Sequence, residues 1–407
     1  MTINPNLLSA ATAILLLISC AQPKLTSEEL HKKLQEEMIA VQEGGVIEIP
    51  EGTYEFTSEL SMRDVKNVTI KGAGMDKTII NFGKQTDGAQ GFYIKADGVT
   101  ISDMTIQDLS GDGIKVHESK DVTIRNVKVE WTNGSSSSNG AYALYPVLCD
   151  GLLIEKCTLT NASDAGIYAG QSRNVILRDN YASMNVQGIA IENCSFVDVY
   201  NNTCEGNACG IAFYNLPDLI EKQGTNVRIH NNIIRNNNHN NFGNPGAIVG
   251  VLPGGTASFI LAGRNVEMDH NTFSNHKTTS TGIVSYQLTE RPYEDSLYYP
   301  FSTGIYVHDN VYEDQEPMLP DTTKRLGKLM ASLFGAESPH IVYDGIFDPA
   351  LIDMETMTIK PEDMICIKNN NTTFCNFNAP SNFADLSREL EGFDCELPRP
   401  QTPKQGS

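Results

Sequence analysis

Short segments in which apolar and polar residues alternate recur along most of the chain. Alternation with a period of two predicts short β-strands. The first series of such segments comprises residues 67–70, 98–101, 121–124, 151–154, 174–177, 196–199, 226–229, 265–268 and 304–307. The steps from Leu152 to Val175 and from Val175 to Val197 are 23 and 22 residues, and longer steps carry the extra residues as loops. A spacing this regular indicates one structural unit repeated many times.

Two further strands accompany the first series in each repeat. A glycine-led series of the type Gly-Ile-x-Val precedes several of its members, at residues 113–116, 140–143, 166–169, 188–191, 210–213 and 282–285. A third, weaker strand follows them, as at residues 127–129 and 233–235. Three short strands in a repeat of about 22 residues are typical of one turn of a parallel β-helix. The sequence therefore predicts an all-β, single-stranded parallel β-helix with three strands per coil.

An asparagine occupies one turn position in successive repeats, five residues after the Val position of the first strand. Its members are Asn180, Asn202, Asn232, Asn271 and Asn310. Asparagine tolerates a left-handed backbone and hydrogen-bonds neighbouring turns. Stacked coils would place these side chains in a ladder, so we interpret them as structural rather than catalytic residues.

The two ends of the repeat region have their own patterns. Thr26-Ser27-Glu28-Glu29 is typical of a capping box, and the apolar residues that follow it predict a cap helix over residues 26–45. We therefore divide the chain into a lipoprotein signal peptide (1–20), a linker and N-terminal cap helix (21–45), the β-helix (46–312) and an irregular C-terminal cap (313–407). Residues 324–334 predict a short helix within that cap.

The first twenty residues read as an export signal. Ala10 to Ile18 is apolar apart from Thr12, which is the length of a signal core and too short to span a bilayer. It ends in Leu17-Ile18-Ser19-Cys20, which resembles the bacterial lipobox, although residues 1–8 contain no Lys or Arg. The resemblance implies lipidation at Cys20. We expect an exported protein, anchored by lipid in the bacterial cell envelope.

Seven of the eight remaining cysteines fall into two groups. Cys366, Cys375 and Cys395 lie in a tail rich in Pro and Asn, where export would permit at least one disulfide. Cysteines inside the repeats are expected to be buried free thiols, namely Cys157, Cys194, Cys204 and Cys209. No Cys or Cys/His spacing suggests zinc or haem. We therefore expect no metal site and no cofactor, with bound calcium left open.

Acidic residues outnumber basic ones by 50 to 30, which gives a formal net charge of −20. Such a surface repels polyanions, so nucleic acid is excluded as a partner. An acidic substrate would need a locally basic groove.

The repeat strings resemble those of the right-handed β-helix superfamily that includes pectate lyases, polygalacturonases and alginate epimerases. The resemblance covers roughly Val46 to Tyr312. The stretches 112–116, 139–147 and 163–172 look like those of exported bacterial parallel β-helix repeat lipoproteins of unknown function. The resemblance implies an extracellular location and a polysaccharide or other glycan as partner. The Asp-Pro-His-Asp string of alginate epimerases is missing, and so are the characteristic strings of polygalacturonases.

Outward-facing residues of the glycine-led strands predict a polar and aromatic groove. We aligned Lys115 and His117 with Tyr142 and Leu144 on the next coil, because side chains alternate along a strand. The candidate catalytic residues are Lys115, His117, Asp164, Tyr168 and Glu192. The candidate substrate-binding residues are Asp112, Arg125, Tyr142, Tyr145, Gln171, Asn193 and Tyr214.

Two kinds of function remain open for this groove. A lyase or epimerase acting on a uronate polymer needs a base, for which Lys115, His117 or Tyr168 qualifies, and a cation, for which Lys115 or Arg125 qualifies. A hydrolase needs two carboxylates, and Asp164 and Glu192 lie on adjacent coils. The alternative is a non-enzymatic binding or scaffold lipoprotein for a glycan or an exported partner protein.

Three loop features bear on the groove. Trp131 is assigned to the core or to loop packing with equal weight. The segments 236–244 and 289–301 would either wall the groove or decorate the surface.

Overall fold

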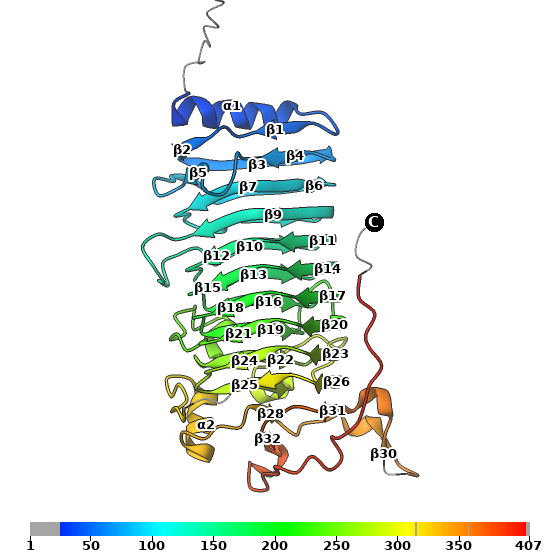
Figure 1. Cartoon of the computed structure of the whole chain (residues 1–407). Coiled ribbons are helices and arrows are strands. Elements are labelled where there is room, and N and C mark those ends of the chain that lie inside the picture. Colours follow the sequence, from blue (N-terminus) through cyan, green and yellow to red (C-terminus); the bar gives the residue numbers. More distant parts are fainter. Residues whose placement is uncertain (1–24, 314–315, 357, 404–407) are drawn as a thin grey trace, which may run out of the picture.

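The computed structural model is a stack of parallel coils along one axis, with a helix across its N-terminal end (Figure 1). It describes residues 25–313, 316–356 and 358–403. The predicted signal peptide and the lipidation site at Cys20 lie outside the described residues. No helix in the described part of the chain has the length and apolar character needed to cross a membrane.

The glycine-led strands form one parallel sheet of 11 strands, which we call the groove sheet. Its strands, in spatial order, are β3 (Ser58–Lys66), β6 (Asp87–Asp97), β8 (Ile114–His117), β10 (Tyr142–Val147), β13 (Ala165–Gly170), β16 (Gln187–Glu192), β19 (Cys209–Tyr214), β22 (Thr256–Leu261), β25 (Thr279–Val284), β28 (Ile341–Tyr343) and β32 (Phe374–Asn376).

The other two strand series join into a second sheet of 19 strands, which we call the back sheet. The first series is β1 (Val46–Glu48), β4 (Thr69–Lys71), β7 (Thr100–Gln107), β9 (Lys120–Glu130), β11 (Asp150–Glu155), β14 (Arg173–Arg178), β17 (Ser195–Tyr200), β20 (Thr225–His230), β23 (Arg264–Asp269), β26 (Thr303–His308) and β31 (Ile365–Lys368). The third series is β2 (Gly52–Glu55), β5 (Thr78–Asn81), β12 (Thr158–Thr160), β15 (Tyr181–Ser183), β18 (Thr203–Glu205), β21 (Ile233–Arg235), β24 (Thr272–Ser274) and β27 (Val311–Tyr312). The two series are continuous in β7 and β9, which run through the turn between them.

The core is a set of apolar columns that run along the axis inside the coils. Ile114, Leu144, Ile167, Ile189 and Ile211 are in register on successive strands of the groove sheet, and each is fully buried. Burial of aliphatic side chains removes about 25 cal/mol of unfavourable hydration per Å² of apolar area. The predicted β-helix with three strands per coil is confirmed.

The asparagine ladder is confirmed, with one correction. The backbone N–H of Asn180 donates to Oδ1 of Asn202 at 3.0 Å, and the pattern continues through Asn232, Asn271 and Asn310. None of the five has a positive φ, and the left-handed residue is the one before each, such as Asn201 with φ of 55°. The ladder residues therefore hydrogen-bond across the coils, while their predecessors make the turn.

A second ladder was not predicted. Asn185, Asn207 and Asn237 stack in the turn that leads into the groove sheet, and each N–H donates to the next Oδ1 at 3.0 Å. The signal was present in the sequence, because each lies five residues after a member of the first ladder.

The N-terminal cap is the helix α1 (Ser27–Ala40), which covers the first coil. Thr26 and Glu29 form the predicted capping box, and Leu30, Leu34 and Met38 are buried against the coil beneath. The helix ends at Ala40, before the predicted boundary at residue 45. Trp131 belongs to the core, where its indole N–H donates to Leu109 O at 2.8 Å.

The predicted end of the β-helix at residue 312 is too early. β28, β31 and β32 continue the two sheets in parallel register after long insertions, which broke the repeat in the sequence. The predicted short helix is confirmed as α2 (Arg325–Phe334), and a small hairpin of β29 (Ile352–Asp353) and β30 (Thr358–Ile359) lies in the last insertion. Short 3₁₀ turns occur at residues 249–251, 286–289, 349–351, 361–363 and 379–381.

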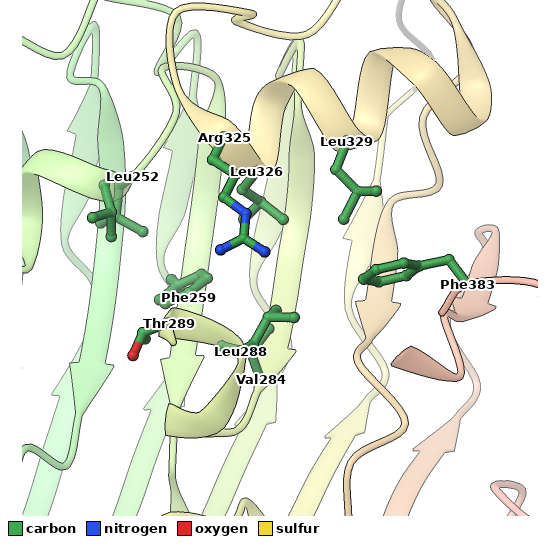
Figure 2. Close-up of a pocket in the computed structure, with 10 residues that line it drawn as sticks. Leu252, Phe259, Val284, Leu288, Thr289, Arg325, Leu326, Leu329 and Phe383 are labelled. Atoms are coloured by element: carbon green, nitrogen blue, oxygen red, sulfur yellow. The ribbon is translucent and has the colours of Figure 1, made fainter. Parts of the chain in front are cut away.

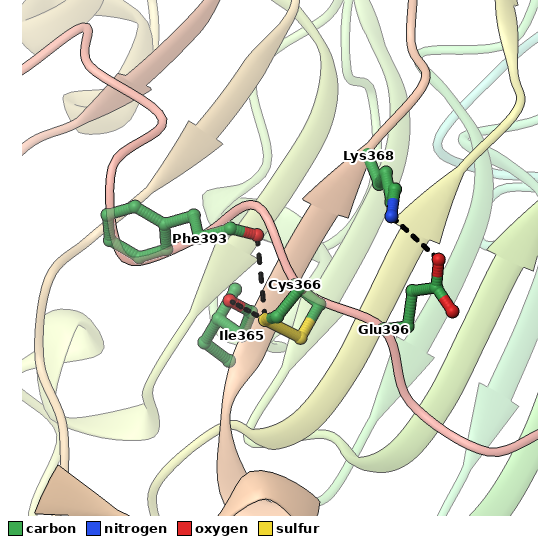
Figure 3. The surroundings of a disulfide bond; sticks show 6 residues. Ile365, Cys366, Lys368, Phe393 and Glu396 are labelled. Atoms are coloured by element: carbon green, nitrogen blue, oxygen red, sulfur yellow. Dashed lines mark hydrogen bonds and ion pairs between the residues drawn. A yellow bond between two sulfur atoms is a disulfide. The ribbon is translucent and has the colours of Figure 1, made fainter.

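One disulfide, between Cys366 and Cys395, ties the C-terminal tail to β31 (Figure 3). The ion pair between Lys368 and Glu396 at 2.6 Å fastens the same segment. The expectation of at least one bridge in this region is confirmed. Cys157, Cys194, Cys204 and Cys209 are buried free thiols, as expected, and so are Cys149 and Cys375.

Candidate functional site

A pocket of about 350 Å³ opens on the outer face of the groove sheet, across β10 to β19. Its sheet residues are Tyr142, Asp164, Tyr168, Gln187, Glu192 and Tyr214. Loops that follow or precede these strands supply Leu216, Pro217, Asp218, Ala247, Ile248, Val249, Tyr286 and Arg291. We call this the carboxyl pocket.

The pocket exists because small residues interrupt a column of large ones. Tyr168 is in register with Ala190 and then with Ala212 on the next two strands, and the column ends at Phe259. Both alanines are fully buried. Tyr168 and Phe259 thus flank a gap two coils long.

Asp164 lies just before β13, and its carboxyl group is largely shielded from water by the pocket. Gln187 Nε2 donates to its Oδ1 at 3.1 Å, and the Tyr214 hydroxyl donates to the amide oxygen of the same Gln187. Burial raises the pKa of Asp164 to about 7; the Gln187 and Tyr142 hydrogen bonds oppose this shift, and the charge of Glu192 adds to it. The raised pKa favours the protonated form of Asp164 compared with an exposed aspartate.

Glu192, at the end of β16, is the second carboxyl group and is 9% exposed. Burial raises its pKa, while a hydrogen bond from the Tyr168 hydroxyl opposes that rise. Burial and the charge of Glu192 raise the pKa of Tyr168 well above its usual value. Tyr168 therefore stays protonated, so the hypothesis that it acts as a base does not fit this structure.

Three tyrosines form an aromatic cluster at the pocket edge. The ring centroids of Tyr142 and Tyr168 are 4.5 Å apart, and Tyr145 meets Tyr168 at 5.2 Å. Lys115 places its Nζ 4.8 Å from the centroid of the Tyr145 ring. Asp112 lies in the same region, where burial raises the pKa of its carboxyl group and Lys115 lowers it.

The predicted alignment of the outward column was wrong on one coil. Lys115 is in register with Tyr145, and Leu144 is in register with Ile114 and points inward. Tyr142 is instead in register with Ala165 and reaches the pocket from the start of its strand. The residue that faces Gly113 on the next coil is Ala143, whose backbone oxygen lies beside it. The alignment used Gly140 instead, which is three positions earlier in the chain.

His117 lies in the same column as Glu192, separated from it by Val147 and Gly170 on the intervening strands. It does not line the carboxyl pocket. Burial lowers its pKa, and the neighbouring charge of Glu118 opposes this. His117 is therefore badly placed to act as a base on a substrate bound between Asp164 and Glu192.

Three predicted binding residues have other positions or partners. Arg125 is exposed on β9 of the back sheet, so it cannot supply a cation to the pocket. Gln171 Oε1 accepts from Ile220 N at 2.9 Å, and Asn193 Nδ2 donates to Leu216 O at 2.9 Å. Gln171 and Asn193 therefore hold the loop over residues 215–224 in place, and that loop walls the pocket.

The loop residues of the pocket were only partly foreseen. The segment 289–301 does wall the groove: Arg291 lines it and the Tyr298 hydroxyl donates to Asn215 O at 2.6 Å. Tyr286, which the alternation placed in the outward column, does line the pocket, whereas Asp218 was missed. No local pattern marks Asp218, because its place at the pocket follows from where the loop after β19 folds over the sheet.

One group of potential metal ligands occurs among the described residues, on the back sheet. It comprises Glu267, Asp269 and His308, all of which are buried. Arg228 forms ion pairs with Glu267 at 2.9 Å and with Asp269 at 2.7 Å. Arg399 also lies 3.2 Å from Glu267, so two guanidinium groups balance the two carboxylates of this cluster.

A second pocket, of about 170 Å³, lies between α2 and the groove sheet (Figure 2). It is lined by Val251, Leu252, Phe259, Val284, Leu288, Thr289, Arg325, Leu326, Leu329 and Phe383. This lining is hydrophobic apart from Thr289 and Arg325, so it offers no acid–base pair.

Comparison with known proteins places the fold. A family model described as "Right handed beta helix region" matches residues 90–237 and 132–310, together more than half of the chain. A search of curated proteins found no match.

Solved structures resemble the chain at low sequence identity. The A-module of the Azotobacter vinelandii mannuronan C-5 epimerase AlgE4 is 14% identical, with 84% of this chain and 90% of that chain covered and a TM-score of 0.52. The Streptococcus pneumoniae surface protein and adhesin PfbA is 13% identical, with 78% and 84% covered and a TM-score of 0.51. Both likenesses concern the fold alone.

Proposed function

The chain belongs to the right-handed β-helix family, and on that premise we propose that it cleaves a glycosidic bond in the carboxyl pocket. The observation that carries the proposal is a pair of carboxyl groups that line one pocket from adjacent coils among tyrosine rings, the partly buried Asp164 and the buried Glu192. Glycoside hydrolysis needs two carboxyl groups on either side of the scissile bond.

Asp164 has the properties of the general acid. Its pKa of about 7 keeps a proton available near neutral pH, and a leaving sugar oxygen needs that proton. Gln187 and Tyr142 both hydrogen-bond the Asp164 carboxyl group and so fix its orientation at the pocket.

Glu192 has the properties of the ionised partner. The Tyr168 hydroxyl donates to its Oε1, and a donated hydrogen bond favours the carboxylate form. A carboxylate at this position would activate water or stabilise the positive charge that develops on the sugar ring.

The tyrosines and the charge of the pocket indicate what kind of sugar it takes. The Tyr142 and Tyr168 rings provide apolar faces for stacking. Asp164, Glu192 and Asp218 outnumber Arg291 among the charged residues of the lining. A uronate at the cleavage point would be repelled, so we favour a neutral sugar unit there over the uronate considered from the sequence alone.

The test is a reducing-sugar assay of the purified chain on a panel of neutral and mixed polysaccharides, with products analysed by NMR. We expect new reducing ends and no ultraviolet-absorbing unsaturated product. Absorbance from an unsaturated product would mean lyase chemistry. If the chain binds polysaccharides but produces no new reducing ends from any of them, it is a binding protein and not a hydrolase.

The pH dependence follows from the two carboxyl groups. The acid form of Asp164 is present below its pKa of about 7 and is lost above it, so kcat/KM is expected to fall tenfold per pH unit at alkaline pH. At acidic pH, protonation of Glu192 ends activity, and its raised pKa moves that limit upward. Initial rates in constant-ionic-strength buffers measure both limits, and a rate that keeps rising above pH 8 would contradict the assignment of Asp164.

A second candidate is glycan binding without catalysis. Both carboxyl groups already have side-chain partners, Gln187 for Asp164 and Tyr168 for Glu192, as in a rigid binding pocket. Calorimetric binding together with unchanged oligosaccharide after long incubation would favour this function.

We further propose that the domain is tethered to a membrane through lipid at Cys20, on the strength of the lipobox resemblance at residues 17–20. Several acyl chains hold a protein firmly at a membrane. Cells labelled with radioactive palmitate are expected to mark the chain, and Cys20→Ala is expected to abolish the label. Unchanged labelling in the variant would reject the anchor.

A further inference from the structure

Cations and tyrosines alternate along the groove sheet on the N-terminal side of the carboxyl pocket. Lys115 is in register with Tyr93 on one side and Tyr145 on the other. The Arg63 guanidinium lies 4.5 Å from the Tyr93 ring centroid, as Lys115 Nζ lies 4.8 Å from that of Tyr145. We call these four residues the basic track.

The two cations of the basic track, Arg63 and Lys115, form no ion pair among the described residues. Within the described part of the chain, neither Arg63 nor Lys115 lies within 4.0 Å of a carboxylate oxygen in an ion pair, whereas their neighbour Lys95 pairs with Glu118. Lys95 is in register with Arg63 on the adjacent strand, and the carboxyl groups of Glu118 and Asp112 lie in the same region. In a chain of net charge −20, Arg63 and Lys115 are cations that an acidic ligand can reach without breaking an ion pair.

We propose that the basic track binds acidic substituents of the glycan, carboxylate or sulfate, at subsites beyond the carboxyl pocket. This inference rests on the proposed function, because one glycan chain is taken to occupy the carboxyl pocket and the basic track together. Coils stack about 4.8 Å apart, so Lys115 lies roughly 10 Å and Arg63 roughly 19 Å from Tyr168 along the axis. The substrate is then a heteropolysaccharide, neutral at the cleavage point and acidic a few units away.

Charge complementarity supports this occupant over a neutral glycan. The acidic pocket disfavours an acidic sugar, while two unpaired cations over tyrosine rings attract one. An extended glycan running along the axis meets the track and the pocket in turn, since both lie on the outer face of one sheet.

The test compares matched oligosaccharides with the same neutral backbone, one unsubstituted, one carrying uronate and one carrying sulfate. Dissociation constants are measured by calorimetry for the full chain and for Lys115→Met and Arg63→Met, which keep the apolar stem. Each variant is expected to weaken binding of the acidic oligosaccharides by roughly three- to tenfold and to leave the neutral one unchanged. Added NaCl is expected to weaken only the acidic ligands.

Arg125→Met is the matched control, because Arg125 is an exposed cation on the back sheet. Equal affinity of the wild type for acidic and neutral ligands, or an equal loss in Arg125→Met, would overturn the basic track. The comparison of uronate with sulfate identifies the acidic group. If the chain cleaves the polysaccharide but Lys115→Met and Arg63→Met bind acidic ligands as the wild type does, the basic track is rejected and the proposed function stands. If the variants weaken acidic binding but no polysaccharide is cleaved, the proposed function is rejected and the basic track stands.

Discussion

Replacing Asp164 by asparagine is expected to lower kcat by about 10²- to 10⁴-fold on the polysaccharide that the wild type cleaves. Asparagine keeps the shape of the side chain and a carbonyl oxygen that can accept from Gln187. It has no proton to give to a leaving oxygen. The loss should therefore appear in kcat, with substrate binding changed far less.

The experiment measures kcat and KM separately and includes a substrate with an activated leaving group. Such a leaving group departs without protonation, so its cleavage by Asp164→Asn should be much less impaired. Asp385→Asn serves as the control for charge removal, because Asp385 is exposed and is not among the residues that line the carboxyl pocket. An equal loss on both substrates would show that Asp164 does not act as the acid.

Replacing Asn202 by alanine is expected to destabilise the fold by about 3 to 5 kcal/mol, since several buried polar groups lose partners worth about 1 to 3 kcal/mol each. Asn202 Oδ1 accepts from the backbone N–H and from Nδ2 of Asn180. Its own Nδ2 donates to Leu177 O at 2.8 Å. The residue is only 1% exposed, so water cannot replace these bonds without opening the turn.

Urea denaturation followed by circular dichroism measures this loss as a change in the free energy of unfolding. Asn240→Ala is the matched control, because Asn240 is exposed in a loop and makes no ladder contact. A loss below about 1 kcal/mol for Asn202→Ala would mean that the turn rearranges and finds other partners.

The strands and the first asparagine ladder could be predicted because they repeat. Leu152, Val175 and Val197 recur at steps of 23 and 22 residues, and the structure places them in one buried column. The same reasoning failed after residue 312, where long insertions separate β28, β31 and β32. Those strands are held by pairing with earlier coils rather than by a recognisable pattern of their own.

The site could be predicted in part. Asp164, Tyr168 and Glu192 interrupt the repeat on the outward face, and the structure brings them into one pocket. The register of Tyr142 and Tyr145 was misjudged because a shift in alignment along a strand exchanges its inward and outward residues. Leu144 occupies the inward position that the pattern had assigned to Ala141.

The sequence by itself determined the coil, since hydrophobic alternation and turn asparagines are local properties that every repeat must satisfy. Only the tertiary structure decided the site. Whether Gln171 faces a substrate or accepts from Ile220 N depends on how long loops fold back over the sheet. The same folding decides whether Arg291 lines the carboxyl pocket. The burial that raises the pKa of Asp164 likewise comes from residues distant in sequence, so no local pattern contains it.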